Sequence, residues 1–169
     1  YMQQGRTDYG EKEVAAFREQ VRTELVPLCE QLYAAQAKRI GVDTLMFYDE
    51  KRVFPDGNAV PAGDDDFMVE EARKMYHKIS PEAGEFIDFR APFVFSNFNQ
   101  TIFDMQVLTH ELGHAFAGYM AMREQPITEY YSESTDIAEI HSMSMEQFSY
   151  PYAEAFFGKD ADKFRFAHL

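Results

Sequence analysis

The stretch TIFDMQVLTHELGHAFAGYMAM, residues 101–122, decides how the rest of the sequence is interpreted. Apolar residues recur through it at helical spacing, at Ile102, Met105, Leu108, Leu112, Phe116 and Tyr119. Thr101 with Asp104 three residues later has the form of a capping box, a pattern that starts helices. The sequence therefore predicts an amphipathic helix over residues 101–122.

Two histidines lie four residues apart on this helix, in His110-Glu111-Leu112-Gly113-His114. Residues at this spacing project from one helix face about a turn apart, which suits two nitrogens bound to one zinc ion. Glu111 between them can reach the position where a water would bind, and can take its proton during attack on a peptide carbonyl. Gly113 leaves room beside the metal for another backbone or side chain. The HExxH pattern therefore predicts metal-assisted hydrolysis with Glu111 as the catalytic base.

A catalytic zinc ion usually has three protein ligands, so a third is expected downstream. Glu133 follows His114 by 19 residues, the spacing of zinc aminopeptidases, and Glu139 follows it by 25. We favour Glu139 because it lies within a predicted helix over residues 135–148, from which a side chain can be aimed rigidly. Glu133 is kept as the alternative, since it lies in a Ser- and Tyr-rich loop.

Further residues could support the metal ligands from behind. Glu146 lies two helical turns after Glu139 on the same face, and could hold one ligand imidazole by a hydrogen bond, with Asp136 as the alternative. His141 points elsewhere on the helix and is assigned to packing or to an outer contact. His77 and His168 are assigned to the surface. The candidates for an oxyanion donor are tyrosines that no spacing distinguishes, namely Tyr130, Tyr131, Tyr150 and Tyr152.

Upstream of this region the sequence predicts three more helices. Residues 11–39 form a long helix that is bent or interrupted at Pro27, packs in the core and buries Cys29. Residues 67–78 follow three aspartates, which favour the N-terminus of a helix. A Ser-Pro pair at Ser80 starts the next helix.

The predicted fold class is mainly α, a helical zinc-peptidase catalytic core with one short β-strand region before the metal-binding helix. That strand is expected at residues 93–96, and Met143 and Met145 are expected to fill the core. We expect one partial catalytic domain over residues 1–169, with an N-terminal helical part at 1–90 and the zinc-binding helices at 91–169.

The composition limits the partners and the location. The 16 basic and 29 acidic residues give a net charge of −13, and no basic patch is present, so nucleic-acid binding is not expected. No apolar run approaches the length of a membrane span. Cys29 is the only cysteine, which excludes an internal disulfide and favours the cytoplasm.

With these motifs, the sequence resembles the thimet oligopeptidase / oligoendopeptidase F family. The matching stretches are FVFSNFN at 93–99, LTHELGHAF at 108–116 and EIHSMSME at 139–146, and the oligoendopeptidase F branch is indicated by RTDY at 6–9, YDEK at 48–51 and SPEAGEF at 80–86. The resemblance implies a zinc endopeptidase that hydrolyses short oligopeptides in a channel between helical lobes. It assigns His110, His114 and Glu139 to zinc, Glu111 to general base catalysis, and residues 93–96 to pairing with bound peptide.

The resemblance also implies a truncated member. Family members are several times longer, carry a further helical stretch and a Gly-rich loop where Arg90 meets Ala91, and have oxyanion-stabilising His and Tyr residues after the third ligand. The alternative is therefore a zinc-binding fragment or a structural or interaction module without turnover. A third hypothesis is an aminopeptidase-type enzyme that uses Glu133. Apolar faces left exposed could also allow self-association.

Overall fold

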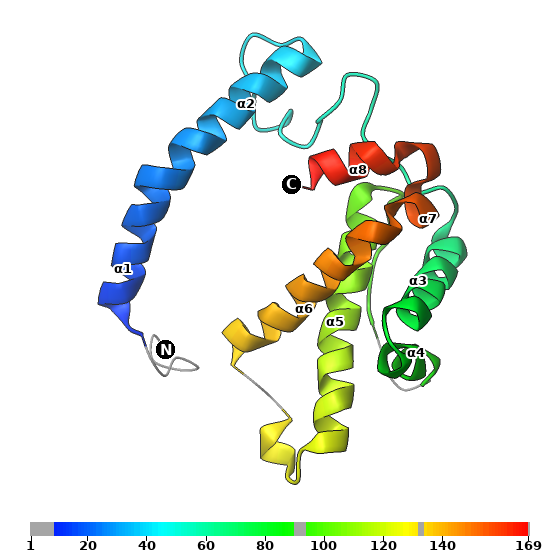
Figure 1. Cartoon of the computed structure of the whole chain (residues 1–169). Coiled ribbons are helices and arrows are strands. Elements are labelled where there is room, and N and C mark those ends of the chain that lie inside the picture. The colour runs from blue at the N-terminus through cyan, green and yellow to red at the C-terminus, as the bar shows by residue number, and fades with distance from the viewer. Residues whose placement is uncertain (1–8, 90–93, 132–133, 169) are drawn as a thin grey trace. The chain divides into compact units, whose positions relative to one another are not determined.

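The structure, a computed structural model, describes residues 9–89, 94–131 and 134–168 and is mainly helical (Figure 1). The chain divides into two compact units, unit 1 over Tyr1–Asn58 and unit 2 over Ala59–Leu169. The predicted helical class is confirmed. No helix in the described ranges is both long and apolar enough to cross a membrane.

Unit 1 contains one long helix made of three segments. They are α1 at Glu11–Gln20, a π-helical turn at Val21–Leu25 and α2 at Val26–Ile40. Proline lacks an amide hydrogen and clashes with the preceding turn, and here the wider π turn ends two residues before Pro27. Gly41 ends the helix with φ of 77°, a left-handed conformation that favours glycine.

The expected core packing of this helix is wrong. Most of its apolar side chains are exposed, among them Phe17, Leu25, Leu28 and Leu32, and Cys29 is exposed too. Among the described residues of unit 1, the buried ones lie in the last turns of α2. There the amide nitrogen of Gln36 lies 2.9 Å from the carbonyl oxygens of Glu50 and Arg52. The loop of unit 1 therefore covers only the C-terminal end of its helix.

Unit 2 holds six α-helices in its described residues. They are α3 at Asp65–Ile79, α4 at Pro81–Asp88, α5 at Ile102–Glu124, α6 at Thr135–Ser149, α7 at Ala153–Phe157 and α8 at Ala161–Ala167. Short 3-10 turns at Thr128–Tyr130, Tyr150–Tyr152 and Gly158–Asp160 connect the later ones.

Helix starts in unit 2 follow the predicted capping chemistry. The carboxylate of Asp64 accepts the amide hydrogen of Phe67 at 3.0 Å, and the hydroxyl of Ser80 accepts that of Ala83 at 3.1 Å. At α5 the buried Asp104 does more than cap. Its two oxygens accept amide hydrogens from Thr101 and from Asn99, each at 3.0 Å, so one carboxylate joins the start of the helix to the segment before it.

The core of unit 2 forms between α5 and the shorter helices. Its largest buried side chains are Met68, Met75 and Tyr76 of α3, Phe86 of α4, Met105 of α5, Phe156 and Phe157 of α7, and Phe164 of α8. The predicted apolar flank of α5 supplies Ile102, Met105, Leu108, Leu112 and Tyr119, all buried, and the half-buried Phe116. The periodicity of residues 101–122 therefore predicted the buried face of α5 correctly.

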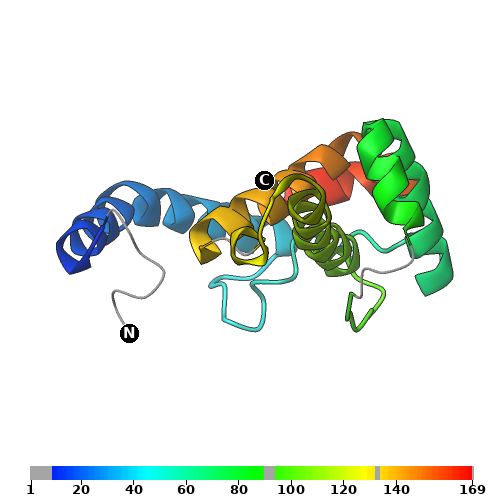
Figure 2. The ribbon, with the colours of Figure 1, turned by 90° about the horizontal axis from the view of Figure 1, so that it is seen from below.

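Helices α5 and α6 lie side by side (Figures 1 and 2). Gly113 allows their close approach, because a Cβ atom at this position would lie 2.8 Å from Cα of Ser142 and 3.1 Å from the carbonyl oxygen of His141. The prediction that Gly113 makes room for another backbone is confirmed. The backbone concerned is that of α6.

The face of α6 that packs inward carries two serines and one methionine. Ser142, Met145 and Ser149 are buried, whereas Ile137, Ile140 and Phe148 are exposed. The expectation that Met143 fills the core is wrong, since it is exposed, and the expectation for Met145 is confirmed. Ser142 and Met145 are the side chains of α6 that face Gly113 of α5.

The short strand expected at residues 93–96 is not seen, since no strand occurs among the described residues. Phe93 lies outside the described residues, and residues 94–98 have no regular secondary structure. Burial nevertheless alternates along them, with Val94, Ser96 and Phe98 half-buried and Phe95 and Asn97 exposed. The side chains keep the period of a strand, but a strand also needs a hydrogen-bonded neighbour.

Candidate metal centre

Helix α5 brings His110 and His114 together on one face, as their spacing predicts. Their Nε2 atoms lie 3.2 Å apart and the ring planes are nearly perpendicular, at 83°. Both side chains are half-buried. Two lone pairs this close repel each other unless a proton or a cation lies between them, so the pair is suited to a shared cation.

Helix α6 adds Glu139 to this pair. Its Oε2 atom lies 3.3 Å from Nε2 of His110 and 3.6 Å from Nε2 of His114. Among the described residues, His110, His114 and Glu139 form a group that could hold a metal ion. Glu133, the alternative third ligand, lies outside the described residues.

The three donor atoms fit a zinc ion in both spacing and chemistry. A tetrahedral zinc with bonds of about 2.0–2.1 Å separates its donors by about 3.3–3.4 Å, and the observed separations run from 3.2 to 3.6 Å. Two imidazoles and one carboxylate are donors that zinc accepts. Three protein ligands leave one position open, which is the arrangement of catalytic rather than structural zinc sites.

Glu146 supports the centre from behind His110. Its Oε1 atom lies 2.7 Å from Nδ1 of His110. The carboxylate accepts the Nδ1 hydrogen, so the lone pair of that ring lies on Nε2, on the side of the other donors. The interpretation of Glu146 as an acceptor for a ligand imidazole agrees with this contact, whereas Asp136 is exposed in the first turn of α6.

Ser142 holds the third donor in the same way. Its side chain is fully buried, and its hydroxyl donates to Oε2 of Glu139 at 2.8 Å. Sequence reasoning assigned no role to this serine. A signal was available, because a serine three residues after a helical glutamate can reach that carboxylate.

Glu111 is half-buried on α5, directly after His110. The tyrosine candidates for an oxyanion donor separate by environment. Tyr130 is exposed, while Tyr150 packs against Phe164 with ring centroids 5.7 Å apart. Burial, together with the charge of Glu146, raises the pKa of the Tyr150 phenol.

The sequence suggested a surface position for His168, and this prediction is wrong. Its side chain is only 11% exposed, its ring stacks on Tyr150 at 4.9 Å, and its Nε2 atom lies 3.8 Å from Oε2 of Glu146. Burial lowers the pKa of the His168 imidazole, although the charge of Glu146 acts against this. His77, by contrast, is exposed as expected.

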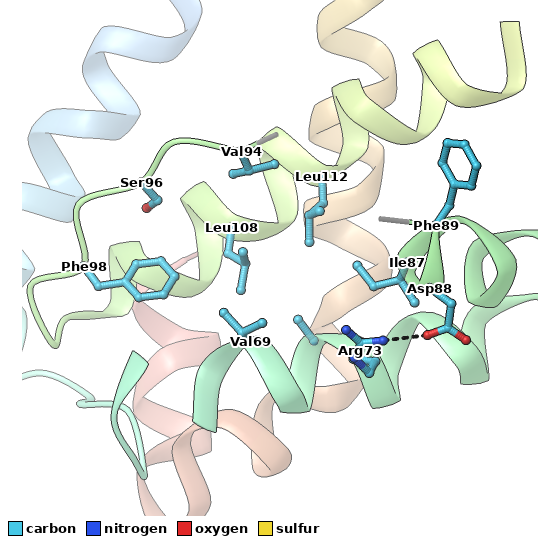
Figure 3. Close-up of a pocket in the computed structure, with 11 residues that line it drawn as sticks. Val69, Arg73, Ile87, Asp88, Phe89, Val94, Ser96, Phe98, Leu108 and Leu112 are labelled. Atoms are coloured by element: carbon cyan, nitrogen blue, oxygen red, sulfur yellow. Dashed lines mark hydrogen bonds and ion pairs between the residues drawn. The ribbon is translucent and has the colours of Figure 1, made fainter. Parts of the chain in front are cut away.

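A pocket of about 630 Å³ lies between α3, the end of α4, α5 and the extended segment 94–98 (Figure 3). Val94 and Ser96 face into it from that segment, and Leu108 and Leu112 do so from α5. None of the three donor residues lines this pocket. It lies on the flank of α5 that faces away from His110 and His114.

A second pocket, of about 400 Å³, follows the contact between α5 and α6. Its lining includes Gly113, Phe116 and Met120 of the first helix and His141 and Met145 of the second. Since Gly113 is the neighbour of His114, this mostly apolar pocket begins beside the donor group. His141 thus lines a pocket and does not join the three donors.

Residues 67–164, more than half of the chain, match the family described as Peptidase family M3. The chain belongs to this peptidase family. Its members are metallopeptidases, and the matched region contains the three donor residues. The resemblance stated from the sequence is therefore confirmed.

Solved structures agree with the family assignment. A protein described as an oligoendopeptidase F of Bacillus anthracis strain Ames is 42% identical with a TM-score of 0.91, and it matches 96% of this chain and 35% of its own length. PZ peptidase A with an inhibitor is 42% identical with a TM-score of 0.91, and the match covers 34% of its own length. Another oligoendopeptidase F is 45% identical with a TM-score of 0.91. The chain thus spans about a third of these relatives. No curated protein matches it significantly.

Proposed function

We propose that the chain is the metal-binding core of a zinc endopeptidase that hydrolyses short peptides. The observation that carries this proposal is the triangle of donor atoms from His110, His114 and Glu139, with sides of 3.2 to 3.6 Å. Membership of Peptidase family M3 supports the reaction class. The donor set supports zinc as the metal.

Each residue has a defined part in this proposal. His110, His114 and Glu139 hold the ion, and a zinc ion there lowers the pKa of water and polarises a peptide carbonyl. Glu111 takes the proton from the attacking water and passes it to the leaving amine. Glu146 keeps the ring of His110 in the tautomer whose Nε2 is free to bind.

The extended segment 94–98 supports peptides as the substrate. A peptide can add to such a segment as a neighbouring strand, with main-chain hydrogen bonds that are indifferent to sequence. The alternation of half-buried and exposed side chains is the pattern expected of a segment used in this way. The names of the similar structures, oligoendopeptidase F, also suggest short peptides.

The proposal includes a cytoplasmic location, supported by the single cysteine, and no nucleic-acid partner, supported by the net charge of −13. The competing hypothesis is a module that binds zinc without turnover. It differs in one measurable outcome, because it predicts zinc without cleavage.

The test combines zinc content with cleavage of a fluorescence-quenched peptide, with and without chelator. We expect one zinc per chain and cleavage that the chelator stops. Glu111→Gln should keep the zinc and lower the cleavage rate by about 10²–10⁴-fold, the usual contribution of a general base. Glu124→Gln, at the exposed end of α5, is the matched control and should cleave normally.

Three results would contradict the proposal. Undiminished cleavage by Glu111→Gln would show that Glu111 is not the general base. Zinc content unchanged in Glu139→Ala would show that the ion binds elsewhere. Zinc bound in the wild-type chain without any cleavage would favour the non-catalytic module.

A further inference from the structure

The carboxylate of Glu146 lies between two imidazoles. Its Oε1 atom contacts Nδ1 of His110 at 2.7 Å, and its Oε2 atom lies 3.8 Å from Nε2 of His168. The Glu146 side chain is only 16% exposed, so solvent contributes little to its orientation. The carboxylate is therefore oriented by its neighbouring side chains. His168 is the neighbour on the side away from the metal donors.

Two helices and the turn after α6 determine the position of His168. The amide nitrogen of Gln106, on α5, lies 2.8 Å from Nδ1 and 3.2 Å from Nε2 of this ring. The ring also stacks on Tyr150, directly after α6, and packs on Phe164 of α8 with centroids 5.4 Å apart. A ring held from so many sides has little freedom to turn.

These contacts select one tautomer of His168. The amide nitrogen of Gln106 can only donate, so the closer Nδ1 acts as the acceptor and Nε2 carries the hydrogen, on the side of Glu146. A flipped Gln106 amide would place its oxygen against Nδ1 and leave a lone pair on Nε2. That lone pair would face a carboxylate and repel it, which disfavours the flip.

Gln106 shows that this arrangement has a cost. Its Oε1 atom is buried and has no hydrogen-bond partner among the described residues. A buried acceptor without a partner destabilises the folded state. The contact with His168 must offset part of that cost, so Gln106 is more than a space-filling residue.

We propose that His168, oriented by Gln106, is a positioning residue that holds the Glu146 carboxylate against the metal ligand His110. A connected path then runs from Gln106 through His168 and Glu146 to His110, across two helices and the end of the chain's last described helix. The inference rests on the proposed zinc site. It adds a residue to that site that acts through another side chain and touches neither metal nor substrate.

The test is a double-mutant cycle on zinc affinity, measured by competition with a chromophoric chelator. Glu146→Gln should weaken zinc binding by about 10–100-fold, as is usual for outer-shell partners. His168→Phe keeps a ring stacked on Tyr150 but removes both nitrogens. It should weaken zinc binding by about 3–10-fold, because His168 is one step further from the metal than Glu146. The double variant should bind zinc no more weakly than Glu146→Gln alone.

A second readout reports geometry directly. Substitution of cobalt for zinc gives visible absorption that depends on ligand geometry. The bands of His168→Phe should shift in the same direction as those of Glu146→Gln, and Gln106→Leu should shift them less. His168→Gln restores a side-chain N–H donor and should recover part of the zinc affinity. His77→Phe, an exposed histidine on α3, is the matched control and should change neither readout.

Far-UV circular dichroism in chelator checks that each variant is folded, and Gln106→Leu supplies a second route that leaves the imidazole in place. Zinc affinity of His168→Phe within about twofold of wild type would overturn the inference. So would additive losses in the double variant, which would mean that His168 acts independently of Glu146. If Glu139→Ala binds zinc normally, the proposed metal site itself is wrong, and that failure is distinct from the other two.

Discussion

The Nδ1 atom of His110 lies 2.7 Å from Oε1 of Glu146, so a carboxylate of α6 stands directly behind an imidazole of α5. This contact and the one from Glu139 join the same two helices. One pair of helices therefore supplies both the donor atoms and the groups that orient them.

Removal of the carboxylate behind His110 should weaken the metal site without unfolding the chain. We expect Glu146→Ala to bind zinc about 10–100-fold more weakly, because the ring loses the partner that fixes its tautomer. Chelator competition measures the change. Gln147→Ala, the exposed neighbour, is the control; an equal loss in that variant would contradict the assignment.

The contact at Gly113 should be sensitive to a single methyl group. Gly113→Ala places Cβ 2.8 Å from Cα of Ser142, a backbone atom that cannot move alone. We expect a loss of about 1–3 kcal/mol in the free energy of unfolding, measured by urea denaturation. Gly118→Ala is the matched control on the same helix, with nothing within 4 Å of the new Cβ. It should stabilise the chain by about 0.5–1 kcal/mol, and the opposite order of the two variants would refute the close-contact argument.

The hydroxyl of Ser142 should matter for the metal more than for the fold. Ser142→Ala removes the hydrogen bond to Oε2 of Glu139. We expect zinc affinity to fall by about 3–10-fold, with a change in unfolding free energy of about 1 kcal/mol or less. Ser144→Ala, half-buried on the same helix, should leave zinc affinity unchanged. Normal zinc binding by Ser142→Ala would show that Glu139 needs no such support.

The lowered pKa of His168 gives the apoprotein a pH dependence of known sign. Because burial disfavours the charged ring, the unfolded chain binds a proton more readily than the folded one. Stability is therefore retained above the unfolded histidine pKa of about 6.5 and falls as the pH drops through and below it. In chelator, the urea midpoint of the wild type should fall more between pH 7.5 and 5.5 than that of His168→Phe. An equal fall in both proteins would contradict this assignment.

Local chemistry made much of unit 2 predictable. Asp64, Ser80 and the Thr101–Asp104 pair start their helices as expected, since a cap is decided within four residues. The four-residue spacing of His110 and His114 likewise fixes their relation before any tertiary contact forms. These parts of the fold and site depend only on helix geometry.

The incorrect predictions concern relations that no local pattern encodes. The apolar stripe of residues 11–39 has helical spacing, but spacing does not say what covers a stripe, and this one is exposed. Gln106 and His168 are 62 residues apart, so their contact leaves no periodicity in the sequence. The strand at residues 93–96 was inferred from β-type side chains, whereas a strand is defined by its partner.

Asp104 links two parts of unit 2, the segment before α5 and α5 itself. One of its oxygens holds the amide of Asn99, beside the extended segment, and the other holds the first turn of α5. A rise of 1.5 Å per residue places His110 about 9 Å further along the same rigid axis. The carboxylate of Asp104 therefore fixes the start of α5 relative to Asn99. The distance from the Asn99 amide to the histidines is thus set by one carboxylate and one helix, and not by the conformation of residues 94–98.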